Sequence, residues 1–131
     1  MTGVAVANYD GEMSFVAGLH ADSHLATGDS ATEPGTVTVP TVDFFEQDHE
    51  VDLMKMDIEG GEWSILTDPR FAGLRATVVV LEWHAQGCPE PDPHEAAARL
   101  LRSAGYSRVE DVEVGTYNGV MWAWRDEQAA T

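Results

Sequence analysis

The feature that most constrains the fold is an uninterrupted apolar run, Ala76-Thr-Val-Val-Val-Leu81. β-Branched residues favour strands, and a run without polar alternation is typical of a strand that is covered on both faces. Strands of that kind occur in parallel sheets that lie under helices. The run therefore predicts a central strand of an α/β domain.

A well-marked helix follows this run. Asp92 can cap the helix, Pro93 suits its first position, Glu95 completes a capping box and Gly105 ends it. The segments beyond Gly105 have strand character and are separated by a single glycine, which predicts an antiparallel pair. The elements predicted after the run are a helix at 92–105 and strands at about 106–114 and 116–124.

The chain before the run is also rich in strand signals. Asp10-Gly11 lies between two apolar stretches and supplies the backbone angles of a tight turn, so a β-hairpin is predicted over residues 4–16. Residues 18–36 are small and polar without a period, which predicts a long loop. The other predicted elements are a strand at 37–39, a short helix at 40–45 capped by Thr41, a buried strand at 51–58 that breaks at Gly60-Gly61, and a short helix at 62–67. The order of these elements predicts a single three-layer α/β domain over residues 1–131.

Charge and composition exclude several classes of function. The chain has 23 acidic and 7 basic residues and a net charge of −16, which would repel a phosphate backbone, so no nucleic-acid partner is predicted. Its apolar runs are too short to cross a bilayer and its first residues lack a secretory signal, so no membrane association and a cytoplasmic location are predicted. Cys88 has no second thiol with which to form a disulfide or a zinc cage. His20 and His24 lack further ligands, so no metal site is predicted.

Charged side chains gather where two predicted strands end. Lys55, Asp57 and Glu59 share one phase of the strand at 51–58, and Glu82 and His84 share a phase just after the apolar run. In open parallel sheets, ligands bind outside the carboxyl ends of the strands. These five residues are therefore expected at one rim and are candidates for a functional site.

The string Val51-Asp-Leu-Met-Lys-Met-Asp-Ile-Glu-Gly-Gly-Glu-Trp-Ser-Ile-Leu66 resembles the "vDllKiDvEGaE…iL" signature of FkbM-type methyltransferases. The resemblance is long and specific, and it continues in order along nearly the whole chain. The further matching segments are 4–11 ("alsd.dG"), 42–45 ("lDdl"), 80–84 ("ivEvH") and 104–106 ("l…GY").

The resemblance implies a Rossmann-like class I methyltransferase fold with a mostly parallel sheet and a C-terminal antiparallel hairpin. It implies S-adenosylmethionine as cofactor and a hydroxyl of a small molecule or sugar as methyl acceptor. By the resemblance, Asp57 and Glu59 lie near the transferring methyl and contact the cofactor. A carboxylate there could take the acceptor's proton, Lys55 could favour its ionised form, and His84 is a second possible base. The expected substrate contacts are Glu62, Glu82 and His84.

The chain also departs from the family pattern. No G-x-G-x-x-G occurs in it, and the family's glycine-rich strand and ribose-binding acid would precede residue 1. The resemblance therefore predicts a fold truncated at its N-terminus, which could be inactive alone. The strand at 51–58 would lose its neighbour, so we expect its open edge to pair with a second copy of the chain or with the strand at 4–7.

Two alternatives to methyl transfer remain open. The chain could be a non-catalytic binding or oligomerisation module derived from a methyltransferase, because it lacks the cofactor loop. The Asp57–Glu59 pair also suggests a glycosidase, although its spacing suits that chemistry poorly. The same charges could instead be a solvated, salt-bridged strand end. Cofactor binding would separate methyl transfer from these alternatives.

Overall fold

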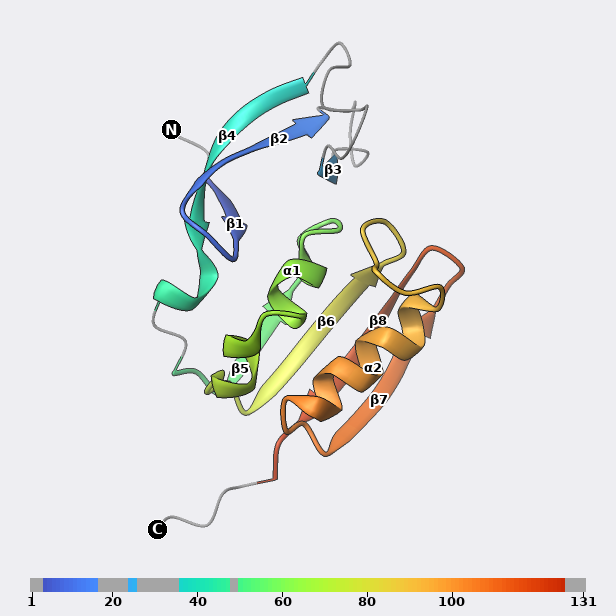
Figure 1. Cartoon of the computed structure of the whole chain (residues 1–131). Coiled ribbons are helices and arrows are strands. Elements are labelled where there is room, and N and C mark those ends of the chain that lie inside the picture. The colour runs from blue at the N-terminus through green and yellow to red at the C-terminus, as the bar shows by residue number, and fades with distance from the viewer. Residues whose placement is uncertain (1–3, 17–23, 26–35, 48–49, 127–131) are drawn as a thin grey trace.

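A computed structural model describes residues 4–16, 24–25, 36–47 and 50–126. These residues form two four-stranded sheets, two α-helices and short 3-10 turns (Figure 1). The described part of the chain is thus a mixed α/β structure, as the sequence predicts. None of its helices is long and apolar enough to cross a membrane.

The C-terminal sheet contains the predicted central strand. Its strands lie in the order β5 (Leu53–Met56), β6 (Val78–His84), β8 (Asn118–Trp124) and β7 (Arg108–Val114). β5 and β6 run parallel, whereas β8 is antiparallel to both β6 and β7. The C-terminal hairpin is confirmed. A mostly parallel sheet is not seen, because the hairpin returns β8 beside β6 in the opposite direction.

Both helices, α1 (Glu62–Leu66) and α2 (Pro93–Ser103), cover the same face of this sheet (Figure 1). Val79, Leu81 and Trp83 of β6 are fully buried, whereas the residues between them are half-buried. This alternation means that β6 is fully covered on one face only. The described residues therefore form a helix layer and a strand layer here, and the predicted three-layer arrangement is not seen.

The helix α2 begins as its sequence predicts. The Asp92 side chain accepts a hydrogen bond from the Glu95 backbone N–H at 3.0 Å, and Pro93 occupies the first turn. Gly105 follows the helix with a φ of 100°, a conformation that strains residues with a Cβ. Ala97 and Leu101 of α2 are fully buried against the sheet. Local capping signals thus fix the position of this helix.

The N-terminal sheet corrects the predicted hairpin. Its strand order is β1 (Ala5–Ala7), β4 (Thr36–Asp43), β2 (Gly11–Val16) and β3 (His24–Leu25). β1 and β2 are strands, but they do not pair with each other: each pairs with β4, β1 in parallel and β2 antiparallel. Asp10 accepts a hydrogen bond from the Asp43 backbone N–H at 2.8 Å, and Thr41 donates to the Tyr9 carbonyl at 2.9 Å. These bonds tie the turn to β4, which separates the two strands.

β4 also occupies most of the segment predicted as a helix. Pro40 lies opposite Glu12 of β2, and Thr41 pairs with strands on both sides, so the extended chain continues to Asp43. A 3-10 turn follows, η3 (Phe44–Glu46), and its cap is Asp43 rather than Thr41. Most of the predicted loop at 18–36 lies outside the described residues, but β3 and the first residue of β4 within it are strand.

Arg70 joins the N-terminal sheet to the helix layer. It lies in η4 (Pro69–Gly73), and its guanidinium donates to Asp43 and to the Asn8 carbonyl, each at 2.9 Å. It also contacts both oxygens of Asp68 at 3.1 and 3.0 Å. The hydrogen bond from Arg70 holds the pKa of Asp68 at about 2, below its usual 3.8. The ionised form of Asp68 is therefore favoured by folding.

The Asp68 carboxylate predicts an acid-sensitive contribution to stability. Because its pKa is lower in the folded chain, its contribution is fully present above about pH 4 and is lost as the pH falls toward 2. We expect the free energy of unfolding of Asp68→Asn to change less over this interval than that of the unsubstituted chain. Urea unfolding at several pH values between 2 and 5 measures this. Equal pH dependence of the two proteins would contradict the assignment.

The outer edge of β5 pairs with no strand that the structure describes. The alternative that β1 moves beside it is wrong, because β1 pairs with β4. A pocket of about 320 Å³ opens next to this edge and is lined mainly by apolar side chains, among them Met54, Met56 and Ile65. Among the described residues, this edge of β5 therefore has no neighbouring strand.

Candidate active site

The parallel pairing of β5 and β6 brings the predicted site residues to one rim. Met56, the last residue of β5, lies opposite Leu81 of β6. Asp57 and Glu59 follow directly after β5, while Glu82 and His84 form the end of β6. All four therefore lie at the carboxyl end of the parallel pair, where ligands bind in open sheets.

The centre of the site is the buried carboxylate of Glu62, the first residue of α1. Its side chain is 0% exposed. One oxygen accepts a hydrogen bond from the Gly60 N–H at 2.9 Å. The other accepts from the His84 backbone N–H at 2.7 Å and lies 3.0 Å from His84 Nδ1. Because a carboxylate only accepts, Nδ1 carries the proton in this contact and Nε2 is left facing the rim.

Two loops pack tightly around this carboxylate. Gly60 has a φ of 95° and Gly87 a φ of 80°, and a Cβ on Gly87 would lie 3.1 Å from the Gly60 carbonyl oxygen. Trp63 donates from Nε1 to the His84 carbonyl at 2.8 Å. Glu59, immediately before Gly60, also has a positive φ of 48°. The glycines thus allow the close approach that places Glu59 beside His84.

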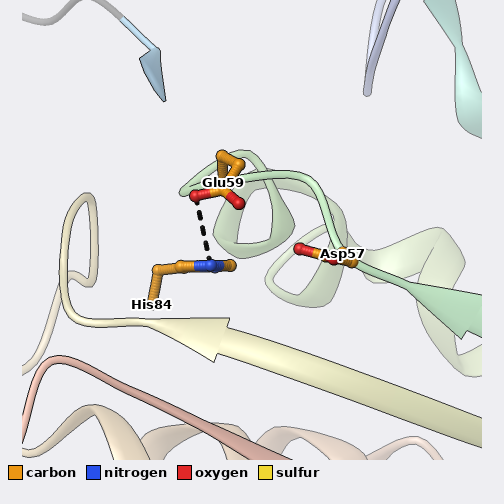
Figure 2. A group of neighbouring side chains, drawn as sticks. All are labelled: Asp57, Glu59 and His84. Carbon is orange, nitrogen blue, oxygen red and sulfur yellow. Dashed lines mark ion pairs between the residues drawn. The ribbon is translucent and has the colours of Figure 1, made fainter. Parts of the chain in front are cut away.

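The outer nitrogen of His84 faces acidic side chains (Figure 2). Nε2 lies 3.3 Å from a Glu59 oxygen and 3.7 Å from a Glu82 oxygen. The hydrogen bond to Glu62 raises the pKa of His84, burial opposes this rise, and the charges of Glu62, Glu59 and Glu82 add to it. His84 is therefore more readily protonated than an ordinary histidine while these carboxylates are its neighbours.

Asp57 and Glu82 form a second contact at the same rim. Burial raises the pKa of Glu82, and so do the charge of Asp57 and a hydrogen bond with it. Lys55 lies 3.7 Å from Asp57, but its side chain is 66% exposed. An exposed pair of this kind contributes at most about 1 kcal/mol to stability. Lys55 thus adds positive charge near Asp57 without fixing its position.

The structure brings together the predicted residues Asp57, Glu59, Glu82 and His84, with Lys55 at the margin. Glu62 differs from its expected role: its fully enclosed side chain holds His84 and Gly60 and is not available to contact a substrate. The hydrogen bond of Trp63 to this site was not predicted from the sequence. Its position one residue after Glu62, at the start of a helix that follows two glycines, is the signal that could have suggested it.

Comparison with known proteins identifies a family. The family model described as "Methyltransferase FkbM domain" matches residues 2–108. No curated protein and no solved structure matches the chain. The family match covers most of the sequence, including β5, β6 and every residue of the rim. The chain therefore belongs to the FkbM methyltransferase family.

Proposed function

We propose that this chain takes part in S-adenosylmethionine-dependent methyl transfer to a hydroxyl group of a small molecule or sugar. The observation that carries the proposal is the oriented His84–Glu62 pair, surrounded by carboxylates at the carboxyl ends of β5 and β6 in an FkbM-family domain. A fixed ring and several carboxylates at a ligand-binding rim can position a hydroxyl and receive its proton.

The residues present suit part of the cofactor. S-adenosylmethionine supplies a methyl group on a positively charged sulfonium, and Asp57 and Glu59 offer negative charge where the family signature places the reaction. The apolar pocket beside β5, lined by Met54, Met56 and Ile65, lies on the same strand and suits an apolar part of a ligand. The sequence has no G-x-G-x-x-G turn to hold the rest of the cofactor.

Each residue of the rim has a distinct role in the proposal. Asp57, whose side chain is 32% exposed, is the proton acceptor for the hydroxyl group. Glu59 lies 3.3 Å from His84 Nε2 and provides negative charge near the transferring methyl. His84 is held in place by Glu62 and presents its outer nitrogen, Nε2, to the rim. Glu82, which lies 3.7 Å from His84 Nε2 and interacts with Asp57, contacts the acceptor.

The substitution Asp57→Asn is expected to lower the rate of methyl transfer by about 10²–10⁴-fold, because removal of a general base has effects of this size. The measurement is formation of S-adenosylhomocysteine at saturating cofactor over a panel of hydroxylated small molecules and sugars. Asp52→Asn is the matched control, because Asp52 is an exposed aspartate just before the other end of β5. Transfer by Asp57→Asn at the rate of the control would contradict the assigned role.

A second candidate is a non-catalytic module that binds another chain. The open edge of β5 and the apolar pocket beside it favour this candidate, because unpaired strand edges recruit partners. In this case β5 pairs with the same strand of a second copy. Sedimentation of the purified chain, combined with a titration with S-adenosylhomocysteine, separates the two candidate functions. A dimer that does not bind S-adenosylhomocysteine supports the module, and cofactor binding supports the enzyme.

A further inference from the structure

Three side chains at the rim offer atoms at distances that suit one cation. One ligand atom each from Asp57, Glu59 and His84 lie within 4.8 Å of one another (Figure 2). Bonds of about 2.0–2.2 Å from a cation to carboxylate oxygen or imidazole nitrogen place neighbouring ligands about 3–4 Å apart. The Asp57 and Glu59 side chains are exposed and have room to rotate toward a shared cation. The three groups are therefore candidates for binding one cation.

His84 distinguishes this group from an ordinary acidic surface. Metal-binding histidines usually donate their second ring N–H to a carboxylate, which fixes the ring and its tautomer. Here Nδ1 lies 3.0 Å from Glu62, whose side chain is 0% exposed and is itself held by the backbone N–H groups of Gly60 and His84. Nε2 is consequently aimed at Glu59, 3.3 Å away, and would bind a cation in place of its proton. This buried support comes from Glu62, which lies outside the three proposed ligands.

The charge around the three ligands is strongly negative. Glu82 lies 3.7 Å from His84 Nε2 and contributes a further carboxyl group. Lys55 contacts Asp57 at 3.7 Å, but its side chain is 66% exposed, so much of its charge is screened by solvent. The chain as a whole carries a net charge of −16. Such a field raises the local concentration of divalent cations.

We propose that Asp57, Glu59 and His84 bind one divalent transition-metal cation, with Mn²⁺ as the best match. Carboxylates suit Mn²⁺ and Mg²⁺, whereas an imidazole ligand favours a first-row transition metal over Mg²⁺. This inference differs from the sequence-based prediction of no metal site. The spacing of the three residues in sequence resembles no metal motif, and the ligands converge only through the parallel pairing of β5 and β6.

The catalytic consequence of this site rests on the proposed methyl transfer. A bound cation lowers the pKa of a hydroxyl group that reaches it. The acceptor hydroxyl would therefore lose its proton more easily at the rim, and the Asp57 oxygen that does not contact the cation could receive it. Metal binding itself does not depend on this step and can be measured without cofactor or acceptor.

The test is a titration of the EDTA-treated, dialysed chain with Mn²⁺, followed by electron paramagnetic resonance of the free ion. We expect saturable binding of one Mn²⁺ per chain, and an increase of the Kd by tenfold or more in Asp57→Asn and in Glu59→Gln. Both side chains are partly exposed, so these variants should fold, and thermal unfolding of each verifies this. His94→Asn is the matched control: His94 also contacts a carboxylate, Asp111 at 2.8 Å, but belongs to no group of three ligands among the described residues.

Each outcome decides the proposal. Binding that is weakened in Asp57→Asn and Glu59→Gln but not in His94→Asn supports it. No saturable binding by the folded chain at millimolar Mn²⁺, or binding that the two site variants leave unchanged, overturns it. A titration with S-adenosylhomocysteine in the presence of EDTA tests the methyltransferase proposal separately, so a failure of one does not imply a failure of the other.

Discussion

The substitution Glu62→Ala is expected to lower the free energy of unfolding by about 3–5 kcal/mol, because it removes a buried charged partner from groups that remain buried. The Gly60 N–H, the His84 N–H and His84 Nδ1 would all lose their acceptor. The side chain of Glu62 is 0% exposed, so its removal also leaves a cavity. Urea unfolding followed by tryptophan fluorescence measures the loss.

Two further variants make this prediction specific. Glu62→Gln keeps the size of the side chain and one acceptor oxygen, so it should lose less stability than Glu62→Ala. Glu110→Ala removes an exposed glutamate that pairs with Arg108 on the surface and should cost at most about 1 kcal/mol. If Glu62→Ala were no more destabilising than Glu110→Ala, the buried carboxylate would not organise the rim as described.

The substitution Gly119→Ala is expected to destabilise the chain by about 3 kcal/mol, at the upper end of what overpacking usually costs. A Cβ at this position would lie 2.5 Å from Trp83 Cζ2 and 2.7 Å from the carbonyl oxygen of Glu113. Trp83 is 1% exposed and so has little room to move, and the second contact is backbone. The strain would therefore fall on the pairing of β8 with β6 and β7. Thermal unfolding of the variant measures its cost.

Gly73→Ala is the matched control for this steric prediction. Nothing lies within 4 Å of a Cβ built on Gly73, so this variant should change the free energy of unfolding by less than about 1 kcal/mol. An equal effect of the two substitutions would indicate that loss of glycine flexibility, rather than the clash with Trp83, sets the cost. A neutral Gly119→Ala would contradict the close approach of β8 to Trp83.

The parts of the fold that the sequence predicts correctly are those with local signals. The strand β6 begins in the run of β-branched residues and continues beyond it to His84, and α2 has its cap, its proline and its terminal glycine in the expected places. The short helix after Gly61 and the C-terminal hairpin are likewise encoded by adjacent residues. In each case the residues that determine the element are its own or its immediate neighbours.

The errors arise where distant residues decide the pairing. β1 and β2 are separated by a tight turn, but β4, some thirty residues away, lies between them. The same partner strands keep Pro40 and Thr41 extended, against their local tendency to start a helix. The run at 76–81 does not reveal that one face of β6 is less covered, because burial depends on what the rest of the chain provides. Pairing and coverage of this kind cannot be determined from local sequence patterns.

The candidate site likewise has features that the sequence predicts and features that only the structure shows. Strand phase and parallel pairing were enough to predict that Asp57, Glu59, Glu82 and His84 share a rim. The burial of Glu62 and its contact with His84 Nδ1 could not be predicted, because they depend on how α1 packs against the loop after β6. For the same reason the convergence of three potential metal ligands became visible only in the structure.

The measurement that tests the central claim most directly is a calorimetric titration of the purified chain with S-adenosylhomocysteine. A methyltransferase site at the rim of β5 and β6 predicts saturable binding at one site per chain, weakened in a chain that carries Asp57→Asn and Glu59→Gln together. No heat of binding from a folded chain at millimolar ligand would contradict the claim and would leave the non-catalytic module as the better account.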